Sequence, residues 1–180
     1  HLTAQHGLTC DNLVGATLVT PDGSTVRTSA DENPELLWGL RGGGGNFGVA
    51  TRLEFRLERL DRVVGGLLDF RGSAVADNLR RFRDLAASSP PHLSCQAIIV
   101  VDDSLSPALV VAPCSTGPSA EPPELRALRS AAGLVDDGVR EHSFLEQQQV
   151  FGGPYGVDRH YWKGHFVREL SDELIDVLLE

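Results

Sequence analysis

Eight consecutive residues carry the strongest chemical signal in the sequence: Gly42, Gly43, Gly44, Gly45, Asn46, Phe47, Gly48 and Val49. Glycine has no Cβ, so it reaches positive φ at little steric cost and lets the backbone approach a ligand closely. Two interpretations of this glycine loop are equally open from these residues alone. Either its N–H groups face a nucleotide, or it is a long helix C-cap followed by a tight turn.

The elements around the loop narrow the first interpretation. The loop contains G-x-G-x-x-G, which binds dinucleotides only where a strand precedes it and a helix follows. Here Asn33 and Pro34 predict the N-cap and first residue of a helix that ends with Gly42 at C′. Residues 49–57 then alternate apolar and polar side chains, which predicts a strand. This reversed order rejects a Rossmann site.

A second chemical signal is the segment HYWKGHFVR. In the strand expected over residues 159–168, Tyr161, Lys163 and His165 share one face. An aromatic strand with Lys and His suits the wall above a planar cofactor, although for any single residue we favour an ordinary amphipathic strand with one packed face. His160 and His165 lie on opposite faces and cannot share a metal ion, so we expect no metal site.

Composition excludes several classes of function. The net charge of −9 argues against a nucleic-acid partner, because phosphate binding needs concentrated Lys and Arg. No apolar run approaches the roughly 18–20 residues that span a bilayer, so we expect no membrane partner. No signal peptide is visible, but we expect the native start to lie outside this sequence, which leaves export open. Of Cys10, Cys95 and Cys114, the last two sit in apolar strands and are expected to be buried, with no support for a disulfide between them.

Periodicity and turn residues predict an α+β chain with a boundary near residue 60. The expected antiparallel sheet is covered by helices. One expected helix is capped by Ser73, and its core-facing side chains are Val75, Leu79, Phe82 and Ala86. A second is expected from Glu124 to residue 132, and a third after Ser171, its expected N-cap. The expected strands are 14–20 and 24–28 as a hairpin, 63–70, 93–101 and 108–112 as a second hairpin, and 138–144.

Several segments resemble one family, the berberine-bridge-enzyme-like FAD-linked oxidases of the vanillyl-alcohol-oxidase superfamily. GLTCDN, LVTPDGSTV and NPELLWGLRGGGGNFGV look like the second half of their PCMH-type FAD-binding domain. GVDRHYWKGHFVRELSDELID looks like a segment of their substrate domain. The resemblance implies part of an FAD-binding domain over residues 1–60 and part of an antiparallel-sheet substrate domain over residues 61–180.

The resemblance also implies parts that this sequence lacks. The family's flavin-phosphate loop, its R-x-G-G-H attachment histidine and its C-terminal catalytic residues have no counterpart here, and Cys10 is not at an attachment position. We therefore expect an interior fragment of a longer protein, assign no catalytic residue, and leave open whether the flavin is covalently bound. The missing N- and C-terminal parts are expected partners of the chain.

The resemblance implies an FAD-dependent oxidase that passes a hydride from an alcohol, amine or sugar-like substrate to the flavin and then to dioxygen. By resemblance, the backbone around Val49 contacts the adenine, and the residues from Gly42 to Val49 let the nucleotide lie close. Two alternatives remain: a reduced, flavin-free binding or assembly module, and a cofactor-independent catalyst on the same scaffold.

Overall fold

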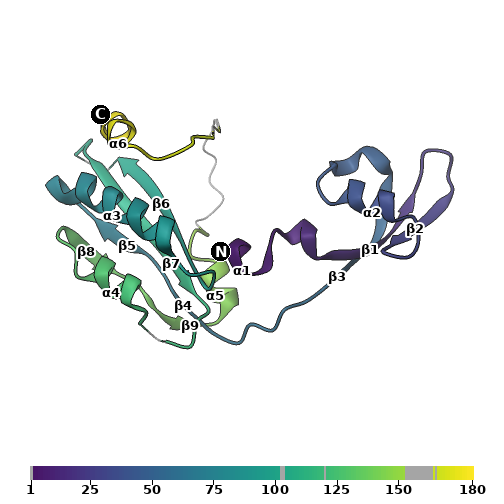
Figure 1. Ribbon diagram of the computed structural model, residues 1–180, viewed down its shortest axis with the longest axis horizontal. Helices are drawn as coiled ribbons and strands as arrows, with labels where there is room; N and C mark the ends of the chain where they lie inside the picture. Colours follow the sequence, from purple (N-terminus) through teal and green to yellow (C-terminus); the bar gives the residue numbers. More distant parts are fainter. Residues whose placement is uncertain (1, 102–103, 120, 153–163, 165) are drawn as a thin grey trace. The chain divides into compact units, whose positions relative to one another are not determined.

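The computed structural model describes residues 2–101, 104–119, 121–152, 164 and 166–180. The chain divides into two compact units, Leu2–Arg59 and Leu60–Glu180. We call them the N-terminal unit and the C-terminal unit (Figure 1). Both combine helices with antiparallel strands, so the chain has the mixed α+β composition that the sequence predicts.

The N-terminal unit is built on a three-stranded antiparallel sheet in the order β2-β1-β3. Its elements are α1 (Thr3–His6), η1 (Thr9–Asn12), β1 (Leu13–Val19), β2 (Thr25–Ser29), α2 (Pro34–Leu40), η2 (Gly44–Phe47) and β3 (Val49–Phe55). The predicted first hairpin is confirmed, since all of β2 pairs with residues 15–19 of β1. Its turn is closed by Asp22, whose carboxylate accepts hydrogen bonds from Thr20 Oγ1 at 2.6 Å and from Ser24 N at 3.1 Å.

Helix α2 begins at Pro34 as predicted, but Asn33 does not cap it with its side chain. Asn33 is left-handed, with φ 49°, and its side-chain amide donates to Arg27 O at 2.8 Å instead. Asn tolerates this conformation better than most residues, so Asn33 ties the helix entrance back to β2. Leu37 is the leucine of α2 that is fully buried, whereas Leu36 and Leu40 are half-buried.

Strand β3 contains a bulge that the sequence pattern did not predict. Thr17 pairs with Arg52 and Leu18 with Ala50, so Thr51 has no partner in the register. An extra residue reverses the faces on which the following side chains lie. The regular alternation predicted for residues 49–57 is therefore wrong across Thr51.

The apolar side chains of β3 lack cover among the described residues. Leu53 and Phe55 pair with the buried residues Ala16 and Leu13, yet they are 51% and 40% exposed. Neighbouring positions on one face of a sheet normally share one core. The N-terminal unit thus presents an uncovered extension of its own core along β3.

We expect this uncovered strip to make the 180-residue chain self-associate. A Leu53→Thr/Phe55→Thr variant should scatter several-fold less light at equal concentration, because exposed apolar patches on strands drive association. Val135→Thr, which replaces an exposed side chain of the C-terminal unit, is the matched control and should change little. Equal scattering by the parent chain and the double variant, in dynamic light scattering, would contradict this prediction.

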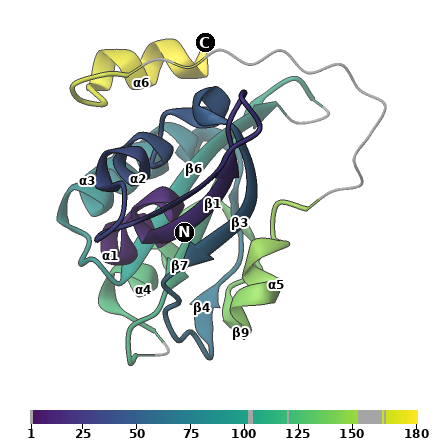
Figure 2. The ribbon, with the colours of Figure 1, turned by 90° about the vertical axis from the view of Figure 1, so that its right-hand side faces the viewer.

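The C-terminal unit is a six-stranded antiparallel sheet in the order β8-β5-β7-β4-β9, with β6 also paired to β7. Its strands are β4 (Val63–Gly65), β5 (Leu68–Phe70), β6 (Leu93–Val101), β7 (Pro107–Ser115), β8 (Leu134–Asp137) and β9 (Arg140–His142). Its helices are η3 (Gly72–Ala74), α3 (Val75–Ser88), α4 (Pro123–Arg129), α5 (Phe144–Gln148) and α6 (Asp172–Leu179). Figure 2 shows α3 and α4 on one side of this sheet and α5 on the other.

The strand predicted over 63–70 is broken in the middle, where it divides into β4 and β5. The strand predicted over 138–144 is shorter than expected, since only β9 forms there, and β8 before it was not predicted. The break between β4 and β5 faces the gap between β8 and β9, because Gly138 N donates to Leu67 O at 2.9 Å. Gly66 has φ 143°, a conformation that residues with a side chain rarely adopt and that interrupts the regular strand. The hairpin of β6 and β7 is confirmed, with β7 longer than predicted.

Helix α3 covers the sheet, but not with all of the predicted side chains. Val75 and Leu79 are buried and Phe82 is partly buried, whereas Ala86 is exposed and Leu85 takes its place in the core. Ser73 does not cap α3, which begins at Val75 after the short η3 turn. The buried core under α3 and α4 comprises Val64, Leu68, Phe70, Leu109, Val111, Leu125, Leu128, Val139 and Ile175, among others.

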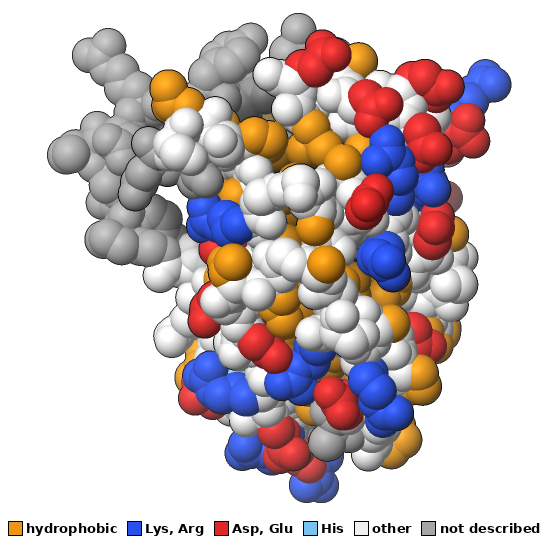
Figure 3. Space-filling view, turned by 90° about the vertical axis from the view of Figure 1, so that its left-hand side faces the viewer, with side chains coloured by type: hydrophobic (Ala, Val, Ile, Leu, Met, Phe, Trp, Pro, Cys, Tyr) orange, Lys and Arg blue, Asp and Glu red, His pale blue; other side chains and the backbone are white. Residues whose placement is uncertain are grey.

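Helix α6 is held against α3 by buried Ile175 and by ion pairs. Arg83 Nη1 lies 2.6 Å from Asp172 Oδ1, and Arg80 Nη2 lies 2.6 Å from Asp176 Oδ1. The hydrogen bond from Arg83 lowers the pKa of Asp172 below its usual range. The predicted cap is confirmed, since Ser171 Oγ accepts from Leu174 N at 3.3 Å. Figure 3 shows acidic and basic side chains interspersed on the face that it displays.

Most of the strand predicted over 159–168 lies outside the described residues. The part that is described, Gly164 and residues 166–168, is not in a strand. In the described part of the chain, no helix is both long and apolar enough to cross a bilayer.

Candidate functional site

The glycine loop joins α2 to β3 at the surface of the N-terminal unit. Residues 42–46 are exposed, Phe47 and Gly48 are half-buried, and the Val49 side chain is 70% exposed. The predicted helix–loop–strand order is confirmed, although the loop itself forms the short η2 turn. The exposed loop thus presents main chain, with few side chains, to whatever lies outside it.

Phe47 holds the loop by resting on two glycines. A Cβ on Gly39 would lie 2.7 Å from Phe47 Cζ, and a Cβ on Gly43 would lie 2.7 Å from Phe47 Cε2. Gly43 N also donates to Gly39 O at 2.8 Å. Gly39 is therefore required by the ring of Phe47, and Gly43 by that ring together with Gly39 O, which a Cβ on Gly43 would meet at 2.4 Å. Both glycines thus have a structural role that needs no ligand.

Three further glycines have backbone reasons of their own. Gly42, Gly44 and Gly48 have φ of 140°, 66° and 138°, which side chains disfavour. At Gly48 a Cβ would also lie 2.5 Å from Val19 O, so β3 can start beside the end of β1 only with glycine there. These positions support the interpretation of the loop as a helix cap followed by a turn.

Gly45 is different from the other glycines of the loop. Its backbone has φ −81° and ψ 16°, within reach of an ordinary residue, and a Cβ would meet nothing within 4 Å. Nothing in the conformation or packing of the described chain requires glycine at this position. A requirement for glycine at Gly45 would have to come from something that approaches the loop from outside.

Sequence reasoning missed a residue that fixes the start of the loop. Arg41 reaches from the end of α2 to β1, where its Nε and Nη2 donate to Leu13 O at 3.0 and 2.7 Å. The partner is a carbonyl 28 positions away, so no local pattern indicates it. Asn46 adds a local tie, since its Nδ2 donates to Gly43 O at 2.7 Å.

The other candidates from the sequence do not join this site. Tyr161, Lys163 and His165 lie outside the described residues. Cys95 and Cys114 are both free thiols on opposite faces of the β6–β7 pair, since Cys95 pairs with Pro113 and Ser94 with Cys114. Burial raises the pKa of Cys95 to about 12 and that of Cys114 to about 11, so neither is a ready nucleophile.

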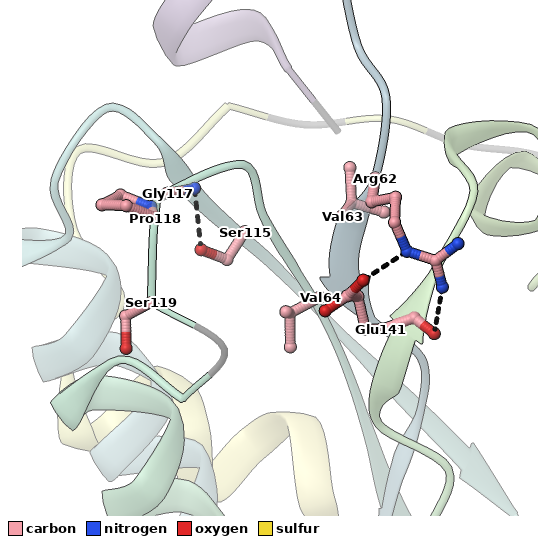
Figure 4. A pocket seen from close by; sticks show the side chains of 8 residues that line it. All are labelled: Arg62, Val63, Val64, Ser115, Gly117, Pro118, Ser119 and Glu141. Carbon is pink, nitrogen blue, oxygen red and sulfur yellow. Dashed lines mark hydrogen bonds and ion pairs between the residues drawn. The ribbon is translucent and has the colours of Figure 1, made fainter.

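A small pocket lies at the end of the C-terminal sheet, with a volume of about 200 Å³. Figure 4 shows Ser115 and the loop that follows it on one side, and Arg62 with Glu141 on the other. Arg62 is already paired with Glu141 through Nε and donates to Glu141 O through Nη2 at 3.3 Å. The pocket is smaller than most ligand sites, and we assign it no ligand. Among the described residues, no group of three His, Cys, Asp or Glu side chains could hold a metal ion.

Known proteins resemble the chain in sequence and in fold. It is 33% identical over 149 residues to (R)-6-hydroxynicotine oxidase of Paenarthrobacter nicotinovorans, which covers 81% of this chain and 32% of that protein. It is 54% identical over 96 residues to chitooligosaccharide oxidase of Gibberella zeae, 51% of this chain and 19% of that protein. No protein-family model matches.

The fold matches a solved structure, that of Physcomitrella patens BBE-like 1, with a TM-score of 0.72 over 98% of this chain and 42% of that one. At 20% identity this likeness supports the fold alone. The fold and the relatives together place the chain among the FAD-linked oxidoreductases. Within them it belongs to the berberine-bridge-enzyme-like family of the vanillyl-alcohol-oxidase superfamily. The chain spans about a third of the length of the nicotine oxidase (32%).

Proposed function

We propose that the chain forms part of an FAD-dependent oxidase and that the backbone from Gly42 to Val49 lies against the adenine end of the cofactor. The observation that carries this proposal is Gly45, which the chain's own geometry does not require. Glycine in place of alanine generally lowers stability where the backbone does not need it. A nucleotide that closely approaches this part of the loop would give Gly45 its reason.

The loop is suited to a flat, partly apolar group. Residues 42–46 are exposed main chain with small or short side chains, and the exposed apolar residues Trp38 and Val49 flank them. A purine ring could lie against such a surface, where it would accept hydrogen bonds from peptide N–H groups and donate them to peptide carbonyl oxygens. The loop would hold only one end of FAD, and the remaining contacts would come from parts of the protein outside this chain.

The roles of the chain's residues follow from this placement. Arg41 fixes the loop's start to β1 and Phe47 fixes its middle to Gly39 and Gly43, so the main chain is set before the cofactor binds. When bound, FAD would supply acceptance of a hydride from an alcohol, amine or sugar-like substrate, with reoxidation by dioxygen. For the C-terminal unit we propose only that it forms part of the substrate domain.

Gly45→Ala in the complete protein tests the proposal. We expect about tenfold less FAD retained per folded protein, since a methyl group that blocks a close contact costs roughly 1–3 kcal/mol. Flavin absorbance against protein concentration measures this. The same change in the 180-residue chain should leave thermal stability equal or slightly higher.

Gly44→Ala is the matched comparison, because Gly44 has φ 66° and a side chain there strains the loop itself. This change should lower the thermal stability of the 180-residue chain, whereas Gly45→Ala should not. A Gly45→Ala protein with its full complement of FAD would overturn the proposed contact. A complete parent protein that purifies without any flavin would instead support the flavin-free module.

A further inference from the structure

The outer edge of β3 has no partner strand in the described part of the chain. The N-terminal sheet has the order β2-β1-β3, so among the described strands β3 pairs with β1 alone. Arg56 N donates to Asn12 O at 2.8 Å, which extends this ladder one residue past the end of β3. Successive residues of a strand turn their N–H and C=O groups to opposite sides. Leu53 and Phe55 therefore turn theirs to the open edge, where a further strand can pair.

The charged side chains along this edge alternate in sign. Residues 52–58 read RLEFRLE, in which the positive Arg52 and Arg56 alternate with the negative Glu54 and Glu58. The distance from Nε to Oε1 is 3.1 Å between Arg52 and Glu54 and 3.7 Å between Arg56 and Glu58. All four side chains are between 37% and 68% exposed. Exposed ion pairs of this kind are weak, so these charges are available to a second chain.

The order of these charges is self-complementary when two copies of the segment meet in antiparallel orientation. With Phe55 opposite the same residue of a second copy, Glu54 faces Arg56. One step further out, Arg52 faces Glu58, and a two-fold axis repeats both contacts. Each of the four charges then meets an opposite charge. Opposite charges directly across an antiparallel pair stabilise it, whereas like charges destabilise it.

Other registers are less well matched. Moving the two-fold axis by one residue, to Glu54 or to Arg56, places like charges opposite each other. Moving it two residues toward the N-terminus restores opposite charges, but it places Phe55 opposite Thr51, the bulge residue with no partner in the register. A bulge disrupts the regular ladder. Moving the axis two residues the other way sets β3 against residues beyond its own end. The axis at Phe55 is therefore favoured.

The apolar side chains of the segment gain cover in the same register. Leu53, Phe55 and Leu57 are 51%, 40% and 87% exposed and alternate with the charged residues, so they share one face. In the antiparallel pair, the two Phe55 rings meet and Leu53 lies opposite Leu57. Two exposed apolar strips thus become one contiguous strip, and removal of apolar surface from water favours the association.

We propose that two copies of this chain pair antiparallel through the open edge of β3, with Phe55 at the two-fold axis. The partner is a second copy because the charge order of residues 52–58 matches its own reverse. The pairing turns the self-association expected of the uncovered strip into a defined dimer. It goes beyond the cofactor loop and does not depend on it, because the paired residues follow Val49 on the strand.

Charge exchange in the 180-residue chain tests the register, with sedimentation velocity as the measurement. Glu54→Arg and Arg56→Glu each place like charges opposite each other twice, because the axis repeats the contact. Each variant alone should dimerise about tenfold more weakly than the parent chain. An equal mixture of the two should dimerise about as well as the parent, since the introduced arginine then faces the introduced glutamate. Recovery in the mixture also shows that both variants are folded.

Arg27→Glu is the matched control, because Arg27 is exposed on β2, at the opposite edge of the same sheet. It makes the same change of charge as Arg56→Glu and should leave dimerisation unchanged.

Cysteine cross-linking tests the position of the axis independently. Directly opposite residues of a hydrogen-bonded antiparallel pair have Cα atoms about 5.5 Å apart, within the range that a disulfide bridges. Phe55→Cys should therefore form a disulfide-linked dimer under mild oxidation. Leu53→Cys should not, because it lies opposite Leu57 in this register.

Five outcomes would overturn the proposal. In the 180-residue chain they are a monomeric parent at submillimolar concentration, full dimerisation of Arg56→Glu alone, a mixture that dimerises no better than either variant, and cross-linking through Leu53→Cys in place of Phe55→Cys. The fifth is a complete protein in which Phe55→Cys forms no cross-link, because another segment of that protein would then occupy the edge.

Discussion

Gly66→Ala should destabilise the C-terminal unit by about 3 kcal/mol or more. The residue combines φ 143° with a close approach to the opposite strand, since a Cβ would lie 2.3 Å from Gly138 O and 2.7 Å from Gly138 C. Both obstacles are backbone atoms, so no side-chain rotation relieves them. In a domain of this size the loss should lower the melting temperature by roughly 10 °C.

Gly72→Ala separates the two causes in the same unit. Gly72 also has a positive φ, 74°, but a Cβ there would meet nothing within 4 Å. It should cost only the conformational part, about 1 kcal/mol. Equal melting temperatures for the two variants in differential scanning calorimetry would contradict this prediction, because they would show that the backbone at Gly138 moves away from Gly66 at no cost.

The break at Gly66 also shows where sequence patterns stop being informative. Residues 63–70 have the apolar, β-rich pattern of one strand, and both halves do pair with β7. The two adjacent glycines inside this pattern, Gly65 and Gly66, are themselves a turn signal, so the break could have been inferred. Its exact partner could not, because Gly138 is 72 positions away and the contact depends on the tertiary fold.

Elements with strong local signals were predicted well. Pro34 sets the start of α2, and Ser171, followed by two acidic residues, sets the start of α6. Helix α5 was missed although Ser143 and Glu146 form a capping box, because a five-residue helix shows too little periodicity to detect. At Asn33 the side-chain cap was predicted but does not form, since the side chain donates to Arg27 O instead.

The features of the candidate sites likewise divide into those that adjacent residues predict and those that depend on the tertiary fold. The position of the glycine loop between a helix and a strand follows from adjacent residues. Adjacent residues do not reveal which glycine of the loop the fold itself does not require, because the ring of Phe47 folds back on Gly39, eight positions earlier.

In the complete protein, Val49→Pro should reduce flavin retention by about ten- to a hundredfold. Under the proposed function the adenine lies against the main chain here, and proline both removes the N–H and fixes φ near −65°. Loss of one buried hydrogen bond, with its partner left unsatisfied, costs about 1–3 kcal/mol. Val49→Ile should retain FAD, because the side chain is 70% exposed and the change preserves the backbone.

The confounding effect is on the sheet, since Val49 and Val19 form the last pair of the β1–β3 ladder. Thr51→Pro controls for this effect: it places proline on the same strand, at the bulge residue that has no partner in the register. Flavin per folded protein, with circular dichroism recorded in parallel, compares the three variants. If folded Val49→Pro keeps as much FAD as Thr51→Pro and Val49→Ile, the glycine loop is a structural turn, and the cofactor contact must be sought elsewhere in the protein.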